Sequence, residues 1–519
     1  MSRELSPFEL WAPRRARGIH STNAGPVATA VRLLLRQRGK EGVVARWLLL
    51  LAVLLAASRA GGEGLDVPLA TFVLDNGLRV VVAPNHLVPA VAVGIHYDVG
   101  SAVEAPGRTG FAHLFEHMMF EGTGNVGKAE HFAIVEEAGG VCNGATGPDH
   151  TEYWQSVPRN ALELALWLEA DRMTGLDLGP ENFENQRAAV LQERRESIDN
   201  RPYYASFLRI NELAYGDFFP YAHPVIGEAA DVAAMPFEET REFFRRHYVP
   251  RAAVLVVAGD VEPDEARALV ERYFGAIPGG DPPPFALPAW TPPAGERVER
   301  MFDPLAPLPA FHIAWRVPPY RSPASYALDL LAVWLTDGET APAYRELVKE
   351  RGLLQQLELG LDERRGPDLF SAWAVVAPGR EVGEARAALD EWIARAARDG
   401  IPPEGLARAK NRRRARFLEE IRSNLRLANA LARYWLYWGD PRLLLGELER
   451  WEAVTAEEVR QAAATWLRPD NRVVLEVLPA APAGPPPARP GAADAGEELP
   501  VPEPPVGEID DREPATELP

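Results

Sequence analysis

The segment His247-Tyr-Val-Pro-Arg-Ala-Ala-Val-Leu-Val-Val257 is similar to a later segment, Trp466-Leu-Arg-Pro-Asp-Asn-Arg-Val-Val-Leu-Glu-Val477. A second pair of segments, Pro89-Ala-Val-Ala-Val-Gly-Ile95 and Pro309-Ala-Phe-His-Ile-Ala-Trp315, has nearly the same spacing. The two offsets are 466 − 247 = 219 and 309 − 89 = 220. A repeat of this length is a duplicated domain and not a solenoid unit. The sequence therefore predicts two halves with one fold.

A proline-rich stretch at 279–293 is predicted to join these halves. They cover residues 61–278, called the N-terminal half below, and residues 294–479, called the C-terminal half. A chain of 519 residues exceeds what one hydrophobic core usually organises, which agrees with such a division. Each half mixes strand-length apolar runs with long helical patterns. This mixture predicts an α+β fold, in which each half is an antiparallel sheet with helices packed on one face.

The two ends of the chain differ from its body. Residues 1–60 predict a leader with a signal peptide, because the apolar run Trp47 to Ala57 is followed by Ser58-Arg-Ala60, a small-x-small cleavage pattern. The run is shorter than the ~20 residues that a stable membrane span needs. We expect the mature chain to begin near Gly61 in the periplasm or outside the cell, with a mitochondrial location as the alternative. The Pro-, Ala- and acid-rich segment 480–519 predicts a disordered tail.

Charge and cysteine content exclude some classes of protein. The formal net charge is −19, and an acidic body of this kind argues against a nucleic-acid partner. The arginine-rich stretch from Arg408 to Arg416 lies in a helical pattern, where long cationic side chains usually form a solvated face. Cys142 is the single cysteine, so no intramolecular disulfide forms.

The motif His113-Leu-Phe-Glu116-His117 places two imidazoles and one carboxylate on a single helical face. Residues three and four positions apart on an α-helix are neighbours, so both imidazoles can reach one metal ion. Zinc binds neutral imidazole, and a catalytic zinc keeps one position for water. The motif predicts that His113 and His117 bind one Zn²⁺ per chain and that Glu116 is the general base for the bound water. The alternative for this motif alone is a histidine pair without a metal.

Zinc needs a third protein ligand, and the stretch Pro180 to Ser197 predicts a helix that carries Glu193. The segment Ala189-Val-Leu-Gln-Glu193 and the HxxEH motif formed by His113, Glu116 and His117 together resemble the pitrilysin/insulinase family of zinc metallopeptidases. The resemblance runs from about Val67 to Pro479 and implies that Glu193 is the third zinc ligand. It also implies a two-domain subunit like those of bacterial processing peptidases, which forms half of a clamshell.

The resemblance extends to a pair of predicted strands. The segments Gly139-Gly-Val-Cys-Asn143-Gly-Ala-Thr146 and Thr151-Glu-Tyr153-Trp154 are similar to the strands on which family members bind a peptide as an added β-strand. The resemblance therefore implies that Asn143, Ala145 and Tyr153 contact the substrate.

Three positions depart from the family pattern. Family members often carry an assisting glutamate seven residues before the third ligand, and here position 193 − 7 = 186 is Gln186. We therefore expect Glu116 to be the only acid or base. Val348 and Gln355 stand where the family commonly has an arginine and a tyrosine that face the zinc.

The C-terminal half lacks the zinc ligands. At an offset of 220, the residues that correspond to His113, Glu116, His117 and Glu193 are Val333, Thr336, Asp337 and Arg413. Only the N-terminal half is expected to be catalytic.

These patterns support two hypotheses of different classes. The first is an exported zinc endopeptidase that hydrolyses short or unfolded peptides, with Glu116 activating a zinc-bound water. The second is a noncatalytic peptide-binding or assembly subunit of a processing-peptidase-like complex. The retained ligand set favours the first. The resemblance implies a closed chamber of four such domains, so we expect a heterodimer with a homologous subunit that lacks the zinc motif, or a homodimer.

Overall fold

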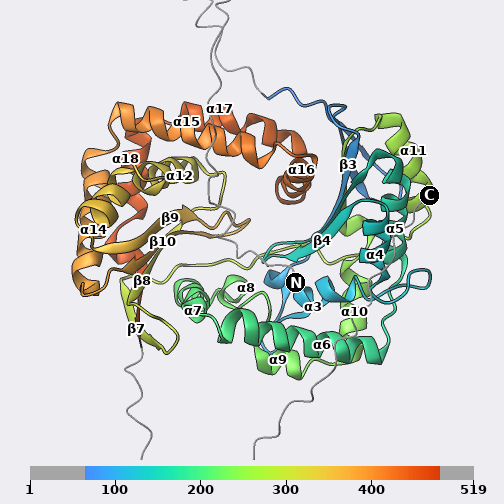
Figure 1. The fold of residues 1–519 in the computed structure, drawn as a ribbon, viewed down its shortest axis with the longest axis horizontal. Coiled ribbons are helices and arrows are strands. Elements are labelled where there is room, and N and C mark those ends of the chain that lie inside the picture. Colours follow the sequence, from blue (N-terminus) through green and yellow to red (C-terminus); the bar gives the residue numbers. More distant parts are fainter. Residues whose placement is uncertain (1–64, 480–519) are drawn as a thin grey trace, which may run out of the picture. The chain divides into compact units, whose positions relative to one another are not determined.

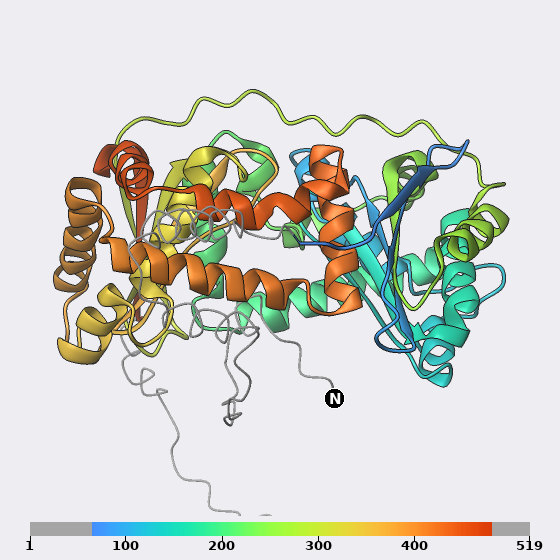
Figure 2. The same cartoon turned by 90° about the horizontal axis from the view of Figure 1, so that it is seen from above.

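The computed structural model describes residues 65–479. The predicted leader, signal peptide and C-terminal tail lie outside the described residues. All elements named below belong to the compact unit that begins at Val67. Figures 1 and 2 show two β-sheets with helices packed on them, which confirms the predicted α+β class.

The sheet of the N-terminal half has six strands in the order β1-β2-β6-β3-β5-β4, so β4 lies at an edge. Its strands are β1 (Ala70–Val73), β2 (Arg79–Pro84), β3 (Ala90–Tyr97), β4 (Val141–Thr146), β5 (Thr151–Pro158) and β6 (Ala253–Gly259). The described helices of this half are α3 (Phe111–Met118), α4 (Glu130–Glu137), α5 (Leu162–Thr174), α6 (Pro180–Arg194), α7 (Tyr204–Tyr215), α8 (Phe219–Ala222), α9 (Ala229–Ala233), α10 (Phe237–His247) and α11 (Pro263–Phe274).

The sheet of the C-terminal half has the order β7-β11-β8-β10-β9, which repeats the order of the first sheet without β1. Its strands are β7 (Arg297–Asp303), β8 (Ala310–Val317), β9 (Leu354–Leu361), β10 (Asp368–Val376) and β11 (Arg472–Pro479). The described helices are α12 (Pro323–Thr336), α13 (Pro342–Tyr344), α14 (Val382–Asp399), α15 (Pro403–Glu420), α16 (Asn424–Trp438), α17 (Glu447–Ala453) and α18 (Ala456–Trp466).

One strand pair in each sheet departs from the predicted antiparallel arrangement. β6 runs parallel to β2, and β11 runs parallel to β7, whereas the other pairs are antiparallel. Parallel pairing needs a long crossover, and in both halves the chain passes through most of its helices before the last strand enters the sheet. β6 is buried along its whole length, as expected for a strand covered on both faces.

The two halves exchange a helix. Val80 and Val82 of β2 pack with the helices of their own half, whereas Val81 and Ala83 belong to an apolar cluster that continues into the C-terminal half. α16 packs on β3 and β6, and in return α7 packs on β8 and β11. These helices start at equivalent positions, 424 − 204 = 220. Each half therefore covers one face of its sheet with its own helices, and the exchanged helix covers the other.

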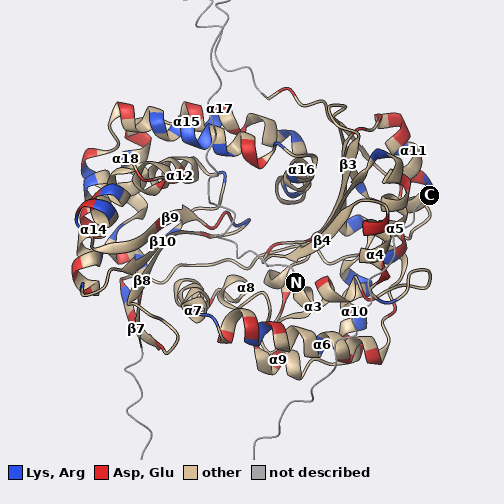
Figure 3. Ribbon diagram, viewed as in Figure 1, with Lys and Arg blue, Asp and Glu red and all other residues tan. Residues whose placement is uncertain are grey.

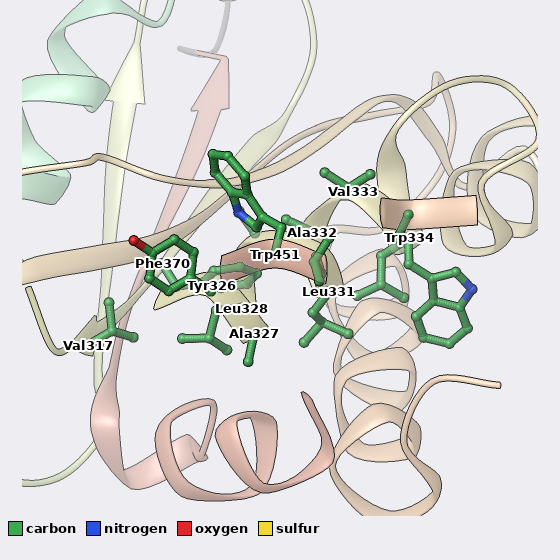
Figure 4. Close-up of a cluster of buried hydrophobic side chains, with 14 of the residues drawn as sticks. Val317, Tyr326, Ala327, Leu328, Leu331, Ala332, Val333, Trp334, Phe370 and Trp451 are labelled. Carbon is green, nitrogen blue, oxygen red and sulfur yellow. The ribbon is translucent and has the colours of Figure 1, made fainter. Parts of the chain in front are cut away.

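One apolar core contains residues of both halves, among them Val81 of β2 and Val254 of β6, so the halves are not independent. Figure 4 shows part of the C-terminal core, in which the ring centroids of Tyr326 on α12 and Trp451 on α17 are 5.8 Å apart. In the stretch 279–293, Trp290 lies 5.6 Å from the Tyr215 ring and 5.4 Å from the Phe218 ring, measured between centroids. The predicted domain boundaries stay a prediction.

Among residues 65–479, no helix is long and apolar enough to cross a membrane.

Candidate metal centre

α3 carries three of the predicted site residues. The helix begins after Gly110, whose φ of 94° lies in the left-handed region that favours glycine. Its apolar residues Phe111, Leu114, Phe115 and Met118 are buried. The helix also contacts α6 and β4, so the elements that carry the other predicted site residues surround it.

Glu104 holds the start of α3, and the sequence analysis missed it. Its carboxylate oxygens accept hydrogen bonds from the backbone N–H groups of Gly110 and Ala112, both at 2.9 Å. The N-cap residue, Gly110, has no side chain that could accept these hydrogen bonds. The Glu104 carboxylate therefore satisfies the buried donors at the positive end of the helix dipole. Burial raises the pKa of Glu104 to about 8, against the effect of these hydrogen bonds. The one signal of this capping role in the sequence is that Glu104 lies six residues before Gly110, the N-cap residue of α3.

Glu193 reaches the histidines from α6. That helix has proline in its first turn, and Val190, one turn before Glu193, is fully buried. A π-helical turn, Arg195–Asp199, follows, and the Ser197 hydroxyl donates to the Glu193 carbonyl at 2.6 Å. π-helical turns occur frequently at functional sites.

The three predicted ligands lie together. Oε2 of Glu193 is 3.2 Å from Nε2 of His117 and 3.7 Å from Nε2 of His113. One ligand atom from each residue lies within 4.8 Å of the others. Two imidazole nitrogens and one carboxylate oxygen form the donor set of many catalytic zinc sites, with one position left for water. The residues present therefore fit a zinc ion.

The protonation states are consistent with metal binding. Burial lowers the pKa of His113 to about 4, so its imidazole is neutral near pH 7. Burial alone would lower the pKa of His117, but the hydrogen bond and charge of Glu193 outweigh it and raise that pKa. Burial would likewise raise the pKa of Glu193, yet its contacts with the two imidazoles lower it. In the absence of metal, Glu193 therefore attracts a proton to His117 that a bound cation would displace.

Glu116 lies between the histidines and the edge strand β4. Burial raises the pKa of its carboxyl group, and a hydrogen bond with Thr146 opposes the shift. A Cβ atom on Gly144 of β4 would lie 3.2 Å from Cγ of Glu116, so glycine leaves the room that this side chain needs. Asn143 and Ala145, on either side of Gly144, are exposed at the sheet edge. They are placed where an added strand could pair, and their substrate role stays a prediction.

Tyr153 does not fit its predicted role in substrate binding. Its side chain is fully buried, and its hydroxyl donates to the Phe115 carbonyl of α3 at 3.2 Å. The guanidinium carbon of Arg172 lies 4.5 Å from the centre of its ring. Side chains alternate between the two faces of a strand, and Tyr153 points to the face that supports α3. Tyr153 therefore helps to position α3 from the buried face of the sheet.

The three residues that depart from the family pattern, Gln186, Val348 and Gln355, lie in different parts of the structure. The Gln186 side chain hydrogen-bonds with His117. Val348 packs against the core of the C-terminal half, whereas Gln355 is exposed on β9.

The C-terminal half forms ion pairs where the N-terminal half has its candidate ligands. Arg413 is 5% exposed and donates to Oδ2 of Asp329 at 2.8 Å, and Asp337 pairs with Arg412 at 2.6 Å. The expected solvated arginine face on α15 is therefore wrong for Arg413, although Arg408 and Arg414 are exposed. Figure 3 shows the blue Lys and Arg positions along α15. Among the described residues of this half, no group of histidine, cysteine and acidic side chains could hold a metal.

The comparisons with known proteins agree with this geometry. The family description Insulinase (Peptidase family M16) matches residues 79–218, and the description Peptidase M16 inactive domain matches residues 235–413. The zinc protease PqqE of Helicobacter pylori is 30% identical over 286 residues, which are 54% of this chain and 64% of that protein. An uncharacterized zinc protease of Mycobacterium leprae, ML0855, is 29% identical over 75% of this chain and 87% of its own length.

More distant relatives include subunits of larger assemblies. A probable mitochondrial-processing peptidase subunit beta of Arabidopsis thaliana is 27% identical over 50% of this chain and 49% of that protein. The crystal structure of a protease from Helicobacter pylori has a TM-score of 0.76 at 24% identity and covers 80% of this chain and 100% of that chain. The periplasmic protease PqqL of Escherichia coli has a TM-score of 0.66 at 19% identity and covers 80% of this chain but only 48% of that chain. The two matched family domains and these relatives show that the chain belongs to the insulinase (M16) family of peptidases.

Proposed function

We propose that this chain is an exported zinc-dependent endopeptidase that hydrolyses short or unfolded peptides. The proposal rests on one observation: the side chains of His113, His117 and Glu193 lie close enough together to bind one metal ion. Glu116 lies on α3, the helix of the two histidines, beside the edge strand β4. Zinc bound by these ligands would lower the pKa of a water molecule to about 7 and polarise the scissile carbonyl.

The protein side chains have separate roles in this mechanism. Glu116 accepts the proton of the attacking water and transfers it to the leaving amine, because it is the carboxylate of the motif that binds no metal. Its raised pKa suits this exchange. Gln186 orients His117 through its hydrogen bond and takes no part in proton transfer.

β4 is the surface that would bind the peptide. As an edge strand it offers unpaired backbone groups, and an extended peptide can add to it by β-augmentation. The exposed side chains of Asn143 and Ala145 would then contact the peptide, while Gly144 keeps Glu116 close to the scissile bond. Most backbone groups of a folded protein are already paired, whereas those of an unfolded peptide are free to pair with β4, so the proposal favours unfolded substrates.

The decisive experiment combines metal analysis with a quenched-peptide assay. The zinc-loaded chain should cleave the peptide, and a chelator should abolish cleavage. Glu116→Gln should bind as much zinc at this site as the wild type while kcat falls about 10²–10⁴-fold. Near-normal turnover of the variant would overturn the mechanism.

The alternative is a noncatalytic peptide-binding or assembly subunit, and a specific observation keeps it open. The C-terminal domain matches a family domain described as inactive, and Val348 and Gln355 replace the expected arginine and tyrosine. Peptide binding without cleavage by the fully zinc-loaded protein would favour this alternative.

We also propose that a second subunit completes the active site. The coverage of only 48% of the E. coli protein and the likeness to a mitochondrial-processing peptidase subunit beta support this proposal. The partner would be a homologue that lacks the zinc motif, with a homodimer as the alternative. Mass determination in solution and assays with and without a co-purifying homologue test it, and full activity of a strict monomer contradicts it.

Export is proposed from the sequence alone. The apolar run Trp47 to Ala57 and the following Ser58-Arg-Ala60 support cleavage near Gly61 and a periplasmic or secreted mature protein. N-terminal sequencing of the native protein decides this, and an intact leucine run in the purified chain would count against it.

A further inference from the structure

A second cluster of metal-ligand side chains lies across the sheet from the candidate zinc site. His96 of β3 and Glu152 of β5 are direct cross-strand partners, so their side chains share a face. His150 lies on the turn that enters β5, two residues before Glu152. Neighbouring residues of a strand point to opposite faces, so Glu152 points away from the face that holds Tyr153 and α3.

The distances in this cluster match those between ligands of one metal ion. Oε2 of Glu152 lies 3.3 Å from Nε2 of His96 and 3.3 Å from Nε2 of His150. Two ligand atoms that are each ~2.0–2.1 Å from a tetrahedral zinc lie about 3.3 Å apart. The imidazole centroids of His96 and His150 are 5.1 Å apart, close to the 4.9 Å between His113 and His117.

A purely hydrogen-bonded cluster explains these distances less well. N–H···O hydrogen bonds in proteins are usually about 2.7–3.2 Å long, slightly shorter than both 3.3 Å contacts. Both imidazoles also approach the same carboxylate oxygen, although a carboxylate offers two.

The surroundings orient the proposed ligands. The Tyr437 hydroxyl lies 2.6 Å from Nδ1 of His150, which turns Nε2 toward Glu152. Nδ2 of Asn429 donates to Oε1 of Glu152 at 3.4 Å. Oδ1 of Asn429 lies 3.5 Å from Nε2 of His96, so it can accept from that nitrogen in the metal-free protein, and a bound metal would replace this proton. Tyr437 and Asn429 belong to α16, the helix that the C-terminal half contributes to this sheet. Partners of this kind fix ligand orientation in metal sites.

The cluster is sheltered but accessible. The side chain of His96 is fully buried, whereas His150 and Glu152 line a cavity of about 510 Å³ beside α16. Three arginines, Arg413, Arg426 and Arg433, also line this cavity. Arg413 pairs with Glu420 at 3.1 Å and Arg433 with Glu363 at 3.7 Å, and both carboxylates line the cavity too. A hydrated cation could enter through the cavity and keep a water as its fourth ligand.

We propose that His96, His150 and Glu152 bind a second divalent metal ion of the zinc class. Two imidazoles and one carboxylate suit Zn²⁺, and the ion would fasten α16 to the sheet of the N-terminal half. The site is structural, because it lies on the face opposite Glu116. The inference does not rest on the proposed peptidase function.

The test is metal stoichiometry of the full mature chain after zinc loading and exhaustive dialysis. The wild type should retain two zinc equivalents, His113→Ala one, Glu152→Gln one, and the double variant none. In the His113→Ala background, added zinc should still raise the Tm, and Glu152→Gln should remove that rise. Glu262→Gln is the matched control, because Glu262 belongs to an exposed group with His86 and Asp260, and it should retain two equivalents.

Each outcome decides the proposal. A wild type that retains one equivalent, or a His113→Ala variant that retains none, overturns it. Where Glu152→Gln fails to fold, the stoichiometry of the wild type and of His113→Ala still decides. Cobalt substitution of His113→Ala provides a spectroscopic check, and a d–d spectrum typical of octahedral hydrated Co²⁺ would contradict a protein-bound site.

Discussion

The two halves of the molecule pack equivalent helices in equivalent places but hold them together with different chemistry. In the N-terminal half, Glu193 of α6 meets two histidines of α3. In the C-terminal half, position 193 + 220 = 413 is Arg413 of α15, which donates to Asp329 of α12 at 2.8 Å. The Trp451 indole N–H donates to the same carboxylate oxygen at 2.8 Å.

This difference shows which properties of the duplicated fold are constrained. The strand order is the same in both halves apart from β1, and the helix pairs α3/α6 and α12/α15 occupy equivalent positions, because the two halves bury apolar surface in the same way. In the proposed function, the polar contact between the two helices binds zinc in the N-terminal half, whereas the equivalent contact in the C-terminal half is an ion pair. A buried guanidinium paired with carboxylates closes the interhelical contact, whereas the histidine cluster leaves a position for a metal ion.

Glu193→Arg tests the comparison most severely, because it gives the N-terminal half the residue of the C-terminal half. The guanidinium cannot bind zinc and repels the cation. We expect loss of the zinc equivalent at His113 and His117 and a fall in kcat/KM of at least about 10⁴-fold, or about 5.5 kcal/mol. Metal analysis and peptide assays check this. Glu184→Gln, at an exposed position on the same helix, should behave like the wild type.

Arg413→Met should change stability and leave metal content unchanged. Removal of the guanidinium breaks the ion pairs of Arg413 with Asp329 and Glu420 and leaves Asp329 its hydrogen bond from Trp451, which costs about 3–5 kcal/mol of unfolding free energy. Denaturant unfolding measures this loss. Arg414→Met, next to it and exposed, should change the free energy by less than about 0.5 kcal/mol. Equal effects of the two variants would show that the buried ion pair does not hold the helices.

Glu104→Ala tests how α3 begins. It leaves two buried backbone N–H groups without their acceptors and should destabilise the protein by about 1–3 kcal/mol. Because α3 carries both histidines, zinc affinity at this site should also fall. Glu104→Gln keeps one oxygen acceptor and should have a smaller effect on both. An unchanged zinc affinity in Glu104→Ala would show that the carboxylate does not position the helix.

Ser322→Ala is the corresponding change at the start of α12 and should have the smallest effect. The Ser322 side chain accepts a hydrogen bond from the Ser325 N–H at 3.2 Å, an ordinary N-cap. Its loss should cost about 1 kcal/mol and leave zinc content unchanged. Thermal unfolding with metal analysis would measure both. A loss of zinc would contradict the separation of stability and function between the two halves.

The sequence alone determined the duplication, the α+β class and the helical arrangement of the HxxEH motif. These properties are local, because hydrophobic period, proline position and residue spacing act within a few turns of a chain. An offset of 220 from the motif leads to Val333, Thr336, Asp337 and Arg413, and the structure shows Asp337 and Arg413 in ion pairs.

Only the tertiary structure decided which side chains meet across the fold. The burial of Tyr153 and Arg413, the capping of α3 by Glu104 and the exchange of α7 and α16 all depend on contacts between distant segments. His96 and Glu152 are 152 − 96 = 56 positions apart and become neighbours only through the register of β3 and β5. A strand pattern of period two states which residues share a face, but the partner strand and its register are set by the packing of the whole sheet.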